Sequence, residues 1–201
     1  LGYEIELIES WLKQPKKPHT RLDFGRFVEY LKRGVWPFVA MIIGQLILTP
    51  IVALVVMPLM CLVFGAASIM EESEGLGMLC MFVSIAIVFL ATMLVNVPFL
   101  CIITPMKLGA GLSGEIGPAI DFAFIKDFLS RTWKEMCSAY LLFMVIGMFL
   151  FMLGYCVFIV GAYFVAAWMW MAMAHLHYQA YALYLARGGK PIQPPGPQTK
   201  P

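Results

Sequence analysis

The chain has 201 residues, of which 61% are hydrophobic and only 13% are charged. Soluble domains are about 45–50% apolar and about 25% charged, so this composition indicates an integral membrane protein and excludes an ordinary soluble domain. The formal net charge of +2 is too small to favour nucleic acid as a partner.

The N-terminal stretch "IELIESWLK" predicts an amphipathic helix whose apolar face is formed by Ile5, Ile8, Trp11 and Leu12. Its acidic residues do not fit a cleavable signal sequence. Because residue 1 is a leucine rather than a methionine, we expect some N-terminal sequence to precede it. The following segment "QPKKPHT" predicts a break in the helix.

Three uncharged apolar segments follow, at residues 36–64, 78–103 and 136–186. A helix needs about 20 apolar residues to cross the hydrocarbon core, so the first two segments predict one span each and the third predicts two. We place the turn within the third segment near residues 155–161. The predicted fold class is therefore an all-α integral membrane protein with four transmembrane helices arranged as two hairpins.

The basic residues predict the orientation in the membrane. All 14 Lys and Arg residues lie before residue 36, between residues 104 and 135, or after residue 186. The loop on the opposite side carries only Glu71, Glu72 and Glu74. By the positive-inside rule both termini are cytoplasmic, and we expect a multi-pass protein of the prokaryotic cytoplasmic (inner) membrane.

A second amphipathic stretch, "DFGRFVEYLKRGVW", begins at Asp23 and matches the stretch "DFAFIKDFLSRTW", which begins 98 residues later at Asp121. Each copy precedes a predicted hairpin, which indicates an internal duplication. We interpret both copies as amphipathic interfacial helices on the cytoplasmic side, with aromatic residues toward lipid and Lys/Arg toward anionic headgroups. Chance similarity of two amphipathic helices is the alternative.

These patterns divide the chain into five parts. They are interfacial amphipathic helices at 1–35, a first hairpin at 36–103, a cytoplasmic loop and interfacial helix at 104–135, a second hairpin at 136–186, and a proline-rich cytoplasmic tail at 187–201. The tail, "GGKPIQPPGPQTKP" from Gly188, predicts an extended, polyproline-like arm. A disordered tail is the alternative.

The sequence predicts no catalytic, cofactor or metal site. The predicted spans contain no Asp, Glu, Lys or Arg, which argues against ion-coupled transporters, and the five cysteines lack metal-ligand spacing. The stretch "GAGLSG" matches GxGxxG at Gly109, Gly111 and Gly114, but a membrane helix precedes it instead of a strand, so we expect a flexible loop. A b-type haem electron carrier would need two axial ligands, and only the last span contains histidine, so a single chain could not supply a bis-histidine site.

Uncharged polar residues predict one layer inside the membrane. Gln45, Asn96 and His175 fall at similar depths, roughly 12–15 Å at 1.5 Å per residue, and Gln179 shares a helix face with His175. We expect these side chains to hydrogen-bond between helices. The alternative is that each of them bonds the backbone of its own helix.

Two further sets of residues predict packing and anchoring. Gly147 and Gly154 share a helix face and predict close approach of another backbone. Aromatic and basic residues at the ends of the spans predict interfacial anchors, namely Trp36, Trp133, Tyr181, Tyr184 and Arg187.

Two short motifs resemble those of a family of uncharacterised prokaryotic multi-span membrane proteins (domain of unknown function 4013). The first consists of Gly114, Ile116, Ala119, Asp121, Phe122 and Ile125, and the second of Ala174, His175, Leu176, Gln179 and Tyr181. The resemblance covers the second half of the chain well and the first half loosely, through "DFGRFVEYLKRG". It implies a compact membrane fold and brings no established activity or binding site.

These features favour a non-catalytic accessory or scaffold subunit of a larger membrane complex, because charge-free spans with many glycines and methionines suit contacts with other helices. The expected partners are membrane lipids and either other membrane-protein subunits or further copies of the chain. The alternative is a small channel or transporter for a neutral or lipidic solute. We expect neither enzymatic activity nor a cofactor.

Overall fold

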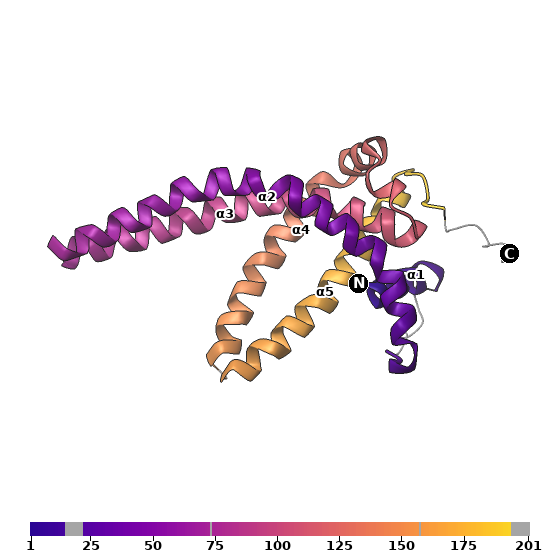
Figure 1. Ribbon diagram of the computed structural model, residues 1–201, viewed down its shortest axis with the longest axis horizontal. Coiled ribbons are helices and arrows are strands. Elements are labelled where there is room, and N and C mark those ends of the chain that lie inside the picture. The colour runs from indigo at the N-terminus through magenta and orange to yellow at the C-terminus, as the bar shows by residue number, and fades with distance from the viewer. Residues whose placement is uncertain (15–21, 73, 157, 194–201) are drawn as a thin grey trace. The chain divides into compact units, whose positions relative to one another are not determined.

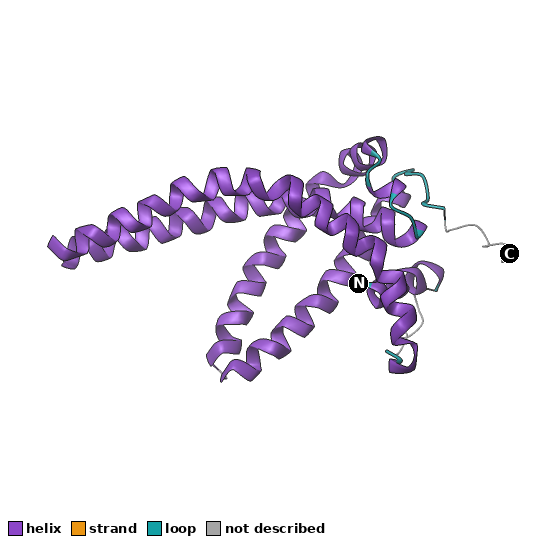
Figure 2. Ribbon diagram, in the orientation of Figure 1, coloured by secondary structure: helices purple, strands orange, loops and turns teal. Residues whose placement is uncertain are grey.

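In the computed structural model the chain is helical, and the residues that the structure describes, 1–14, 22–72, 74–156 and 158–193, contain no strand (Figures 1 and 2). Along them run the helices α1 (Gly2–Lys13), α2 (Phe27–Glu72), α3 (Glu74–Ser113), α4 (Phe122–Cys156) and α5 (Phe158–Ala186). Short 3₁₀ turns, Phe24–Arg26 and Gly117–Ala119, precede α2 and α4. The all-α prediction is confirmed.

Three stretches of the described helices are long and apolar enough to cross a membrane. They are Phe24–Gly65, Gly75–Ser113 and Phe122–Cys156. This supports the membrane character that the composition predicts. Helix α5 is also free of Asp, Glu, Lys and Arg over its whole length, and the predicted total of four spans stays a prediction.

Contacts divide the chain into two units. We call Gln45–Leu100 the two-helix unit, and Leu1–Gly44 together with Cys101–Pro201 the core unit. In the two-helix unit, α2 and α3 run side by side (Figure 1). Many of its large apolar side chains are exposed, among them Leu54 at 76% and Leu94 at 71%. In a membrane these side chains face lipid or neighbouring helices.

The two amphipathic stretches are not separate interfacial helices. The first forms the beginning of α2, which continues through Trp36 and Pro37 into the apolar part, and the second forms the first turns of α4. No helix-ending conformation separates the parts. Gly34 remains helical there, and its missing side chain leaves room for the backbone of Gly2, whose nitrogen would lie 3.0 Å from an added Cβ.

Helix α1 is buried within the core unit. Its apolar residues Ile5 and Ile8 are fully inaccessible, and Leu7 and Trp11 are also buried. Contacts with α5 account for part of this burial. The predicted amphipathic face therefore exists, but protein covers it in place of lipid headgroups, because the following helices supply an equally apolar surface.

The C-terminal end of α3 lies at the centre of the core unit. The stretch predicted as a flexible loop is helical and buried up to Ser113, and the chain turns only at Gly114, whose φ is +69°. A Cβ on Gly111 would lie 2.3 Å from Cδ1 of Ile5, and one on Gly109 would lie 2.8 Å from the carbonyl oxygen of Pro118. These glycines serve close packing rather than flexibility.

Helices α4 and α5 form a second closely packed pair in the core unit. A Cβ on Gly154 would lie 3.1 Å from the carbonyl group of Gly161, so the two backbones approach each other there. One on Gly147 would lie 2.4 Å from Cε of Met169. The predicted turn at residues 155–161 falls where α4 ends and α5 begins, and residue 157 lies outside the described residues.

Candidate functional site

Three ionisable side chains from three helices meet in the interior of the core unit. Glu4 comes from α1, Lys107 from α3 and His177 from α5. Lys107 Nζ donates to Glu4 Oε1 and Oε2 at 2.6 and 2.7 Å, and His177 Nδ1 donates to Glu4 Oε1 at 2.7 Å. None of the three side chains is more than 8% exposed. We call these residues the buried cluster.

Helical spacing explains how Glu4 enters the interior. Glu4, Ile8 and Trp11 lie at positions i, i+4 and i+7, which places the carboxylate on the apolar face of α1. Lys107 precedes Gly111 by one helical turn, and Gly111 is the glycine that admits Ile5. The same close approach of α1 and α3 therefore brings the carboxylate to the ammonium group.

The partners of Glu4 keep its carboxylate ionised. Burial alone would raise the pKa of Glu4, but the hydrogen bond from His177 and the positive charge of Lys107 outweigh it and lower the pKa to about 2. Lys107 balances the charge, and both carboxylate oxygens accept hydrogen bonds. The arrangement fastens α1 to α3 and α5, and its side chains are shielded from solvent.

A neighbouring set of polar contacts joins α3 to α4. Thr104 and Tyr140 share a hydrogen bond between their hydroxyl groups, and both side chains are fully buried. One turn earlier on each helix, the thiols of Cys101 and Cys137 lie 3.7 Å apart and are not joined by a disulfide. The buried cluster joins α1 and α5 to the C-terminal end of α3, and the contacts of Thr104 and Cys101 join α4 to the same end.

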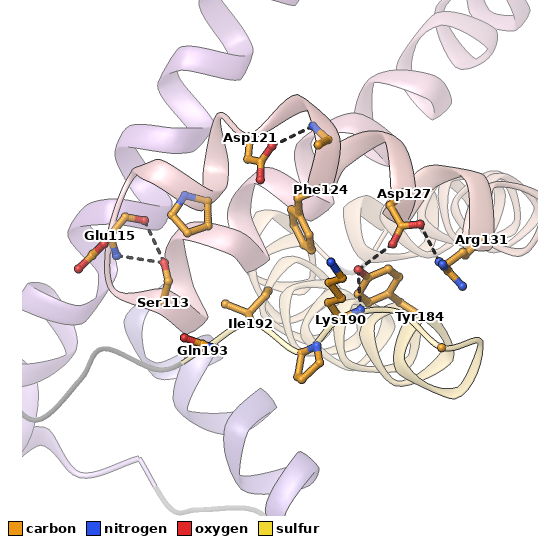
Figure 3. Close-up of a pocket in the computed structure, with 14 residues that line it drawn as sticks. Ser113, Glu115, Asp121, Phe124, Asp127, Arg131, Tyr184, Lys190, Ile192 and Gln193 are labelled. Carbon is orange, nitrogen blue, oxygen red and sulfur yellow. Dashed lines mark hydrogen bonds and ion pairs between the residues drawn. The ribbon is translucent and has the colours of Figure 1, made fainter.

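An open cavity of about 750 Å³ lies elsewhere in the core unit, between the loop after α3, the start of α4 and the segment after α5 (Figure 3). Its lining combines carboxylates, cations and aromatic rings, including Glu115, Asp121, Phe124, Asp127, Tyr184 and Lys190. Asp127 accepts hydrogen bonds from Arg131 Nε at 2.8 Å and from the Tyr184 hydroxyl at 3.0 Å.

The chain after α5 folds back along this cavity. We call residues 188–193 the arm. Gly188 has a φ of +79°, and a Cβ on Gly189 would lie 2.3 Å from the ring of Tyr184, so two glycines make the turn. The backbone N–H of Lys190 donates to the Tyr184 hydroxyl at 3.0 Å, and that of Ile192 donates to the Tyr181 hydroxyl at 2.9 Å. The arm is the first part of the predicted proline-rich tail and contains no helix up to Gln193. Residues 194–201 of that tail lie outside the described residues.

The residues of the predicted polar layer bond within their own helices. Thr49 Oγ1 donates to Gln45 Oε1 at 3.5 Å, and Asn96 Nδ2 donates to the carbonyl oxygen of Thr92 at 2.8 Å. Gln45 and Asn96 belong to the two-helix unit.

The other two members of that layer, His175 and Gln179, are exposed side chains of α5 in the core unit, and their nitrogens lie 3.1 Å apart. The rings of His175 and Trp11 also meet in a T-shaped arrangement, with their centroids 5.3 Å apart. Only Asn96 bonds the backbone of its own helix, as the alternative has it, whereas the bonds of Gln45, His175 and Gln179 join side chains four residues apart on one helix.

The predicted interfacial anchors divide into two groups. Trp36 and Trp133 are 40% and 41% exposed, which suits an interfacial position. Tyr181 and Tyr184 are buried at 3% and 1%, because their hydroxyl groups hold the arm and their rings pack in the core. Arg187 pairs with the carboxylate of Glu135 and so joins α5 to α4.

Sequence reasoning missed the buried cluster. The one available signal was a charged residue on an apolar face, as Glu4 is beside Ile8 and Trp11. His177 lies one and two helical turns before Tyr181 and Tyr184 in a stretch that is typical of an aromatic interfacial anchor, whereas it is buried against Glu4. Among the described residues, no group of three His, Cys, Asp or Glu side chains is arranged to hold a metal ion.

Comparison with known proteins gives one family. No curated protein and no solved structure matches the chain. The sequence signature of the family described as protein of unknown function (DUF4013) matches residues 1–159, which include the motif from Gly114 to Ile125 but not the one at residues 174–181. The match extends through the first half as well, where the resemblance was loose. The chain therefore belongs to the DUF4013 family of proteins of unknown function.

Proposed function

We propose that the protein is a non-catalytic accessory or scaffold subunit of a larger membrane assembly. The observation that carries this proposal is the exposure of both helices of the two-helix unit. Large apolar side chains such as Leu46, Leu54, Phe82 and Leu94 are 65–76% exposed there. Two helices alone bury little of each other, and flexible or branched apolar side chains at their surface suit packing against helices of another subunit.

The buried cluster supports a structural role in the same proposal. A proton carrier or an acid–base catalyst needs an ionisable group that exchanges protons with substrate or solvent. Glu4, Lys107 and His177 satisfy one another and are shielded from solvent. They stabilise the core unit, from which α2 and α3 continue into the two-helix unit.

Transport of a neutral or lipidic solute is the less favoured alternative. That interpretation depended on a polar layer formed between helices by Gln45, Asn96 and His175. The hydrogen bonds of these side chains run within single helices instead. A scaffold role does not require such a layer.

Cross-linking tests the scaffold role. A photo-reactive residue at Leu54 or Leu94 should capture a distinct protein neighbour in intact membranes, identified by mass spectrometry. The same residue at Phe164, which is 75% exposed on α5, is the matched control for general lipid exposure. A monomer in native membranes that gives only lipid adducts at Leu54 and Leu94 would contradict the proposal.

We also propose the duplicated arrangement of two hairpins in a prokaryotic inner membrane, with both termini cytoplasmic. Two equivalent caps support the duplication. Asp23 Oδ1 accepts from the N–H of Gly25 at 2.9 Å, and Asp121 Oδ1 accepts from the N–H of Ala123 at the same distance. The next residues, Phe24 and Phe122, are 79% and 82% exposed.

Reporter fusions at residues 75 and 193 test the orientation and should report opposite sides of the membrane. The same side for both would contradict the orientation.

A further inference from the structure

The cavity beside the arm has the size and lining of a small-molecule site. Its volume of about 750 Å³ falls within the range of about 300–1,000 Å³ that is typical of ligand pockets. Figure 3 shows Glu115 and Asp121 toward one end of it and Arg131, Tyr184 and Lys190 toward the other. Asp127 lies beside Arg131, so one end carries carboxylates alone and the other carries two cations and one carboxylate.

Some of the charged side chains that line the cavity already have partners within the protein, and others do not. Asp127 and Arg131 form an ion pair with each other. Asp121 uses one carboxylate oxygen to cap α4. Within residues 1–193, as far as they are described, the Glu115 carboxylate and the Lys190 ammonium take part in no hydrogen bond or ion pair, although the charge of Lys190 also acts on the nearby Asp127 carboxylate. Two carboxylates at one end and one ammonium at the other therefore remain to bind a ligand.

The wall between these charges is aromatic. The rings of Phe124 and Tyr184 meet edge to face, with centroids 5.9 Å apart, and both residues line the cavity. An aromatic wall suits the short carbon chain of a ligand and also stabilises an ammonium group near it. The arm completes the cavity, because Tyr184 and Tyr181 hold it through its backbone N–H groups at Lys190 and Ile192.

We propose that this cavity binds a small zwitterion that carries an ammonium group and a phosphate, of the phosphoethanolamine type. The ammonium pairs with Glu115 and Asp121, and the phosphate pairs with Lys190. This chemistry occurs in soluble phosphoethanolamine and in the headgroup of an ethanolamine phospholipid. The inference goes beyond a scaffold role and does not depend on it.

Calorimetry on the full chain, purified in detergent without ethanolamine lipid, tests the requirement for both charges. The probes are phosphoethanolamine, ethanolamine and glycerol 3-phosphate. Because each charged contact contributes to affinity, phosphoethanolamine should bind about tenfold or more tightly than either of the other two. Equal binding of ethanolamine, equal binding of glycerol phosphate, or no binding of phosphoethanolamine would each overturn the proposal.

Charge-removing variants of similar size locate the site. Asp121→Asn keeps a capping oxygen on α4 but removes the charge, and Lys190→Gln removes the ammonium. Both should weaken phosphoethanolamine binding about tenfold or more. Asp23→Asn is the matched control, because it changes the equivalent cap before α2 and should leave binding unaltered. Unaltered binding in both cavity variants would overturn the assignment.

The source of the ligand follows from a comparison of two nanodisc preparations. In discs of phosphatidylcholine alone, soluble phosphoethanolamine should bind the wild-type chain as it does in detergent. If ethanolamine phospholipid in the discs abolishes this binding in the wild type, the lipid headgroup occupies the site. If the binding persists, the soluble compound is the ligand. Either result supports the zwitterion site, and failure of binding in both preparations contradicts it.

Discussion

The carboxylate of Glu4 and the ammonium of Lys107 lie 103 residues apart in the sequence and 2.6 Å apart in space. Both are buried, so neither charge can be compensated by water if the other is removed. The pair fixes the position of α1 against α3, and the hydrogen bond from His177 extends this connection to α5.

Replacement of Lys107 by Met should strongly destabilise the core unit. The change leaves the Glu4 carboxylate buried without its cation, which typically costs about 3–5 kcal/mol. The double variant Glu4→Gln/Lys107→Met removes both charges and should recover part of the loss. Thermal denaturation in detergent measures both effects. As a control, Glu9→Gln on the same helix removes a more exposed pair with Arg33 and should cost about 1 kcal/mol or less.

Acid should weaken the protein through Glu4. Its pKa is lowered in the folded protein to about 2, so its contribution to stability is fully present above the pKa of the unfolded chain and is lost as the pH falls toward 2. A difference of roughly two pKa units corresponds to about 3 kcal/mol. The wild type should therefore lose more thermal stability than Glu4→Gln between pH 5 and pH 3. Parallel pH profiles of the two proteins would contradict this role of Glu4.

Gly111→Ala should destabilise the protein by about 1–3 kcal/mol, because the added Cβ would overlap the side chain of Ile5. Gly65→Ala is the matched control, since its added Cβ meets nothing within 4 Å in another helix. There the better helix propensity of alanine should stabilise by up to about 1 kcal/mol. The melting temperature should therefore fall in Gly111→Ala and rise in Gly65→Ala. Similar shifts in both variants would show that α1 does not pack closely on Gly111.

Tyr184→Phe should release the arm without disturbing α5. The variant loses one hydrogen bond to Asp127 and one from the N–H of Lys190, worth about 1–3 kcal/mol together. Hydrogen exchange of the Lys190 and Ile192 amides should become faster. Tyr178→Phe is the control on the same helix and should leave both rates unchanged, because the Tyr178 ring keeps its contact with Trp11.

The helical class and the apolar face of α1 could be predicted because both follow from local spacing. Ile5, Ile8 and Trp11 are separated by helical intervals, and they are buried as that pattern requires. What covers the face could not be predicted, because lipid and the apolar side of another helix attract it alike.

The contacts of single residues depended on neighbours that are distant in the chain. Gly109 and Gly111 suggest flexibility when only local sequence is considered, but the approach of Ile5 and Pro118 makes them packing residues. His177 and Tyr184 lie in a sequence that is typical of an interfacial anchor, and only the positions of Glu4 and the arm bury them. The burial of these residues cannot be predicted from the spacing of apolar residues, because it depends on parts of the chain that only the tertiary structure brings together.

The buried cluster has a consequence for biosynthesis. Glu4 and His177 are separated by 173 residues, so α1 leaves the ribosome long before its last partner is made. At about 5–20 residues per second, the delay is roughly 10–35 s. The Glu4 carboxylate has no cation until Lys107 of α3 is made and lacks His177 until α5 follows, so the face of α1 that carries it stays incompletely covered during that interval. The membrane surface or a chaperone must shelter α1 until α5 is inserted, and the docking of Glu4 then marks the completion of the core unit.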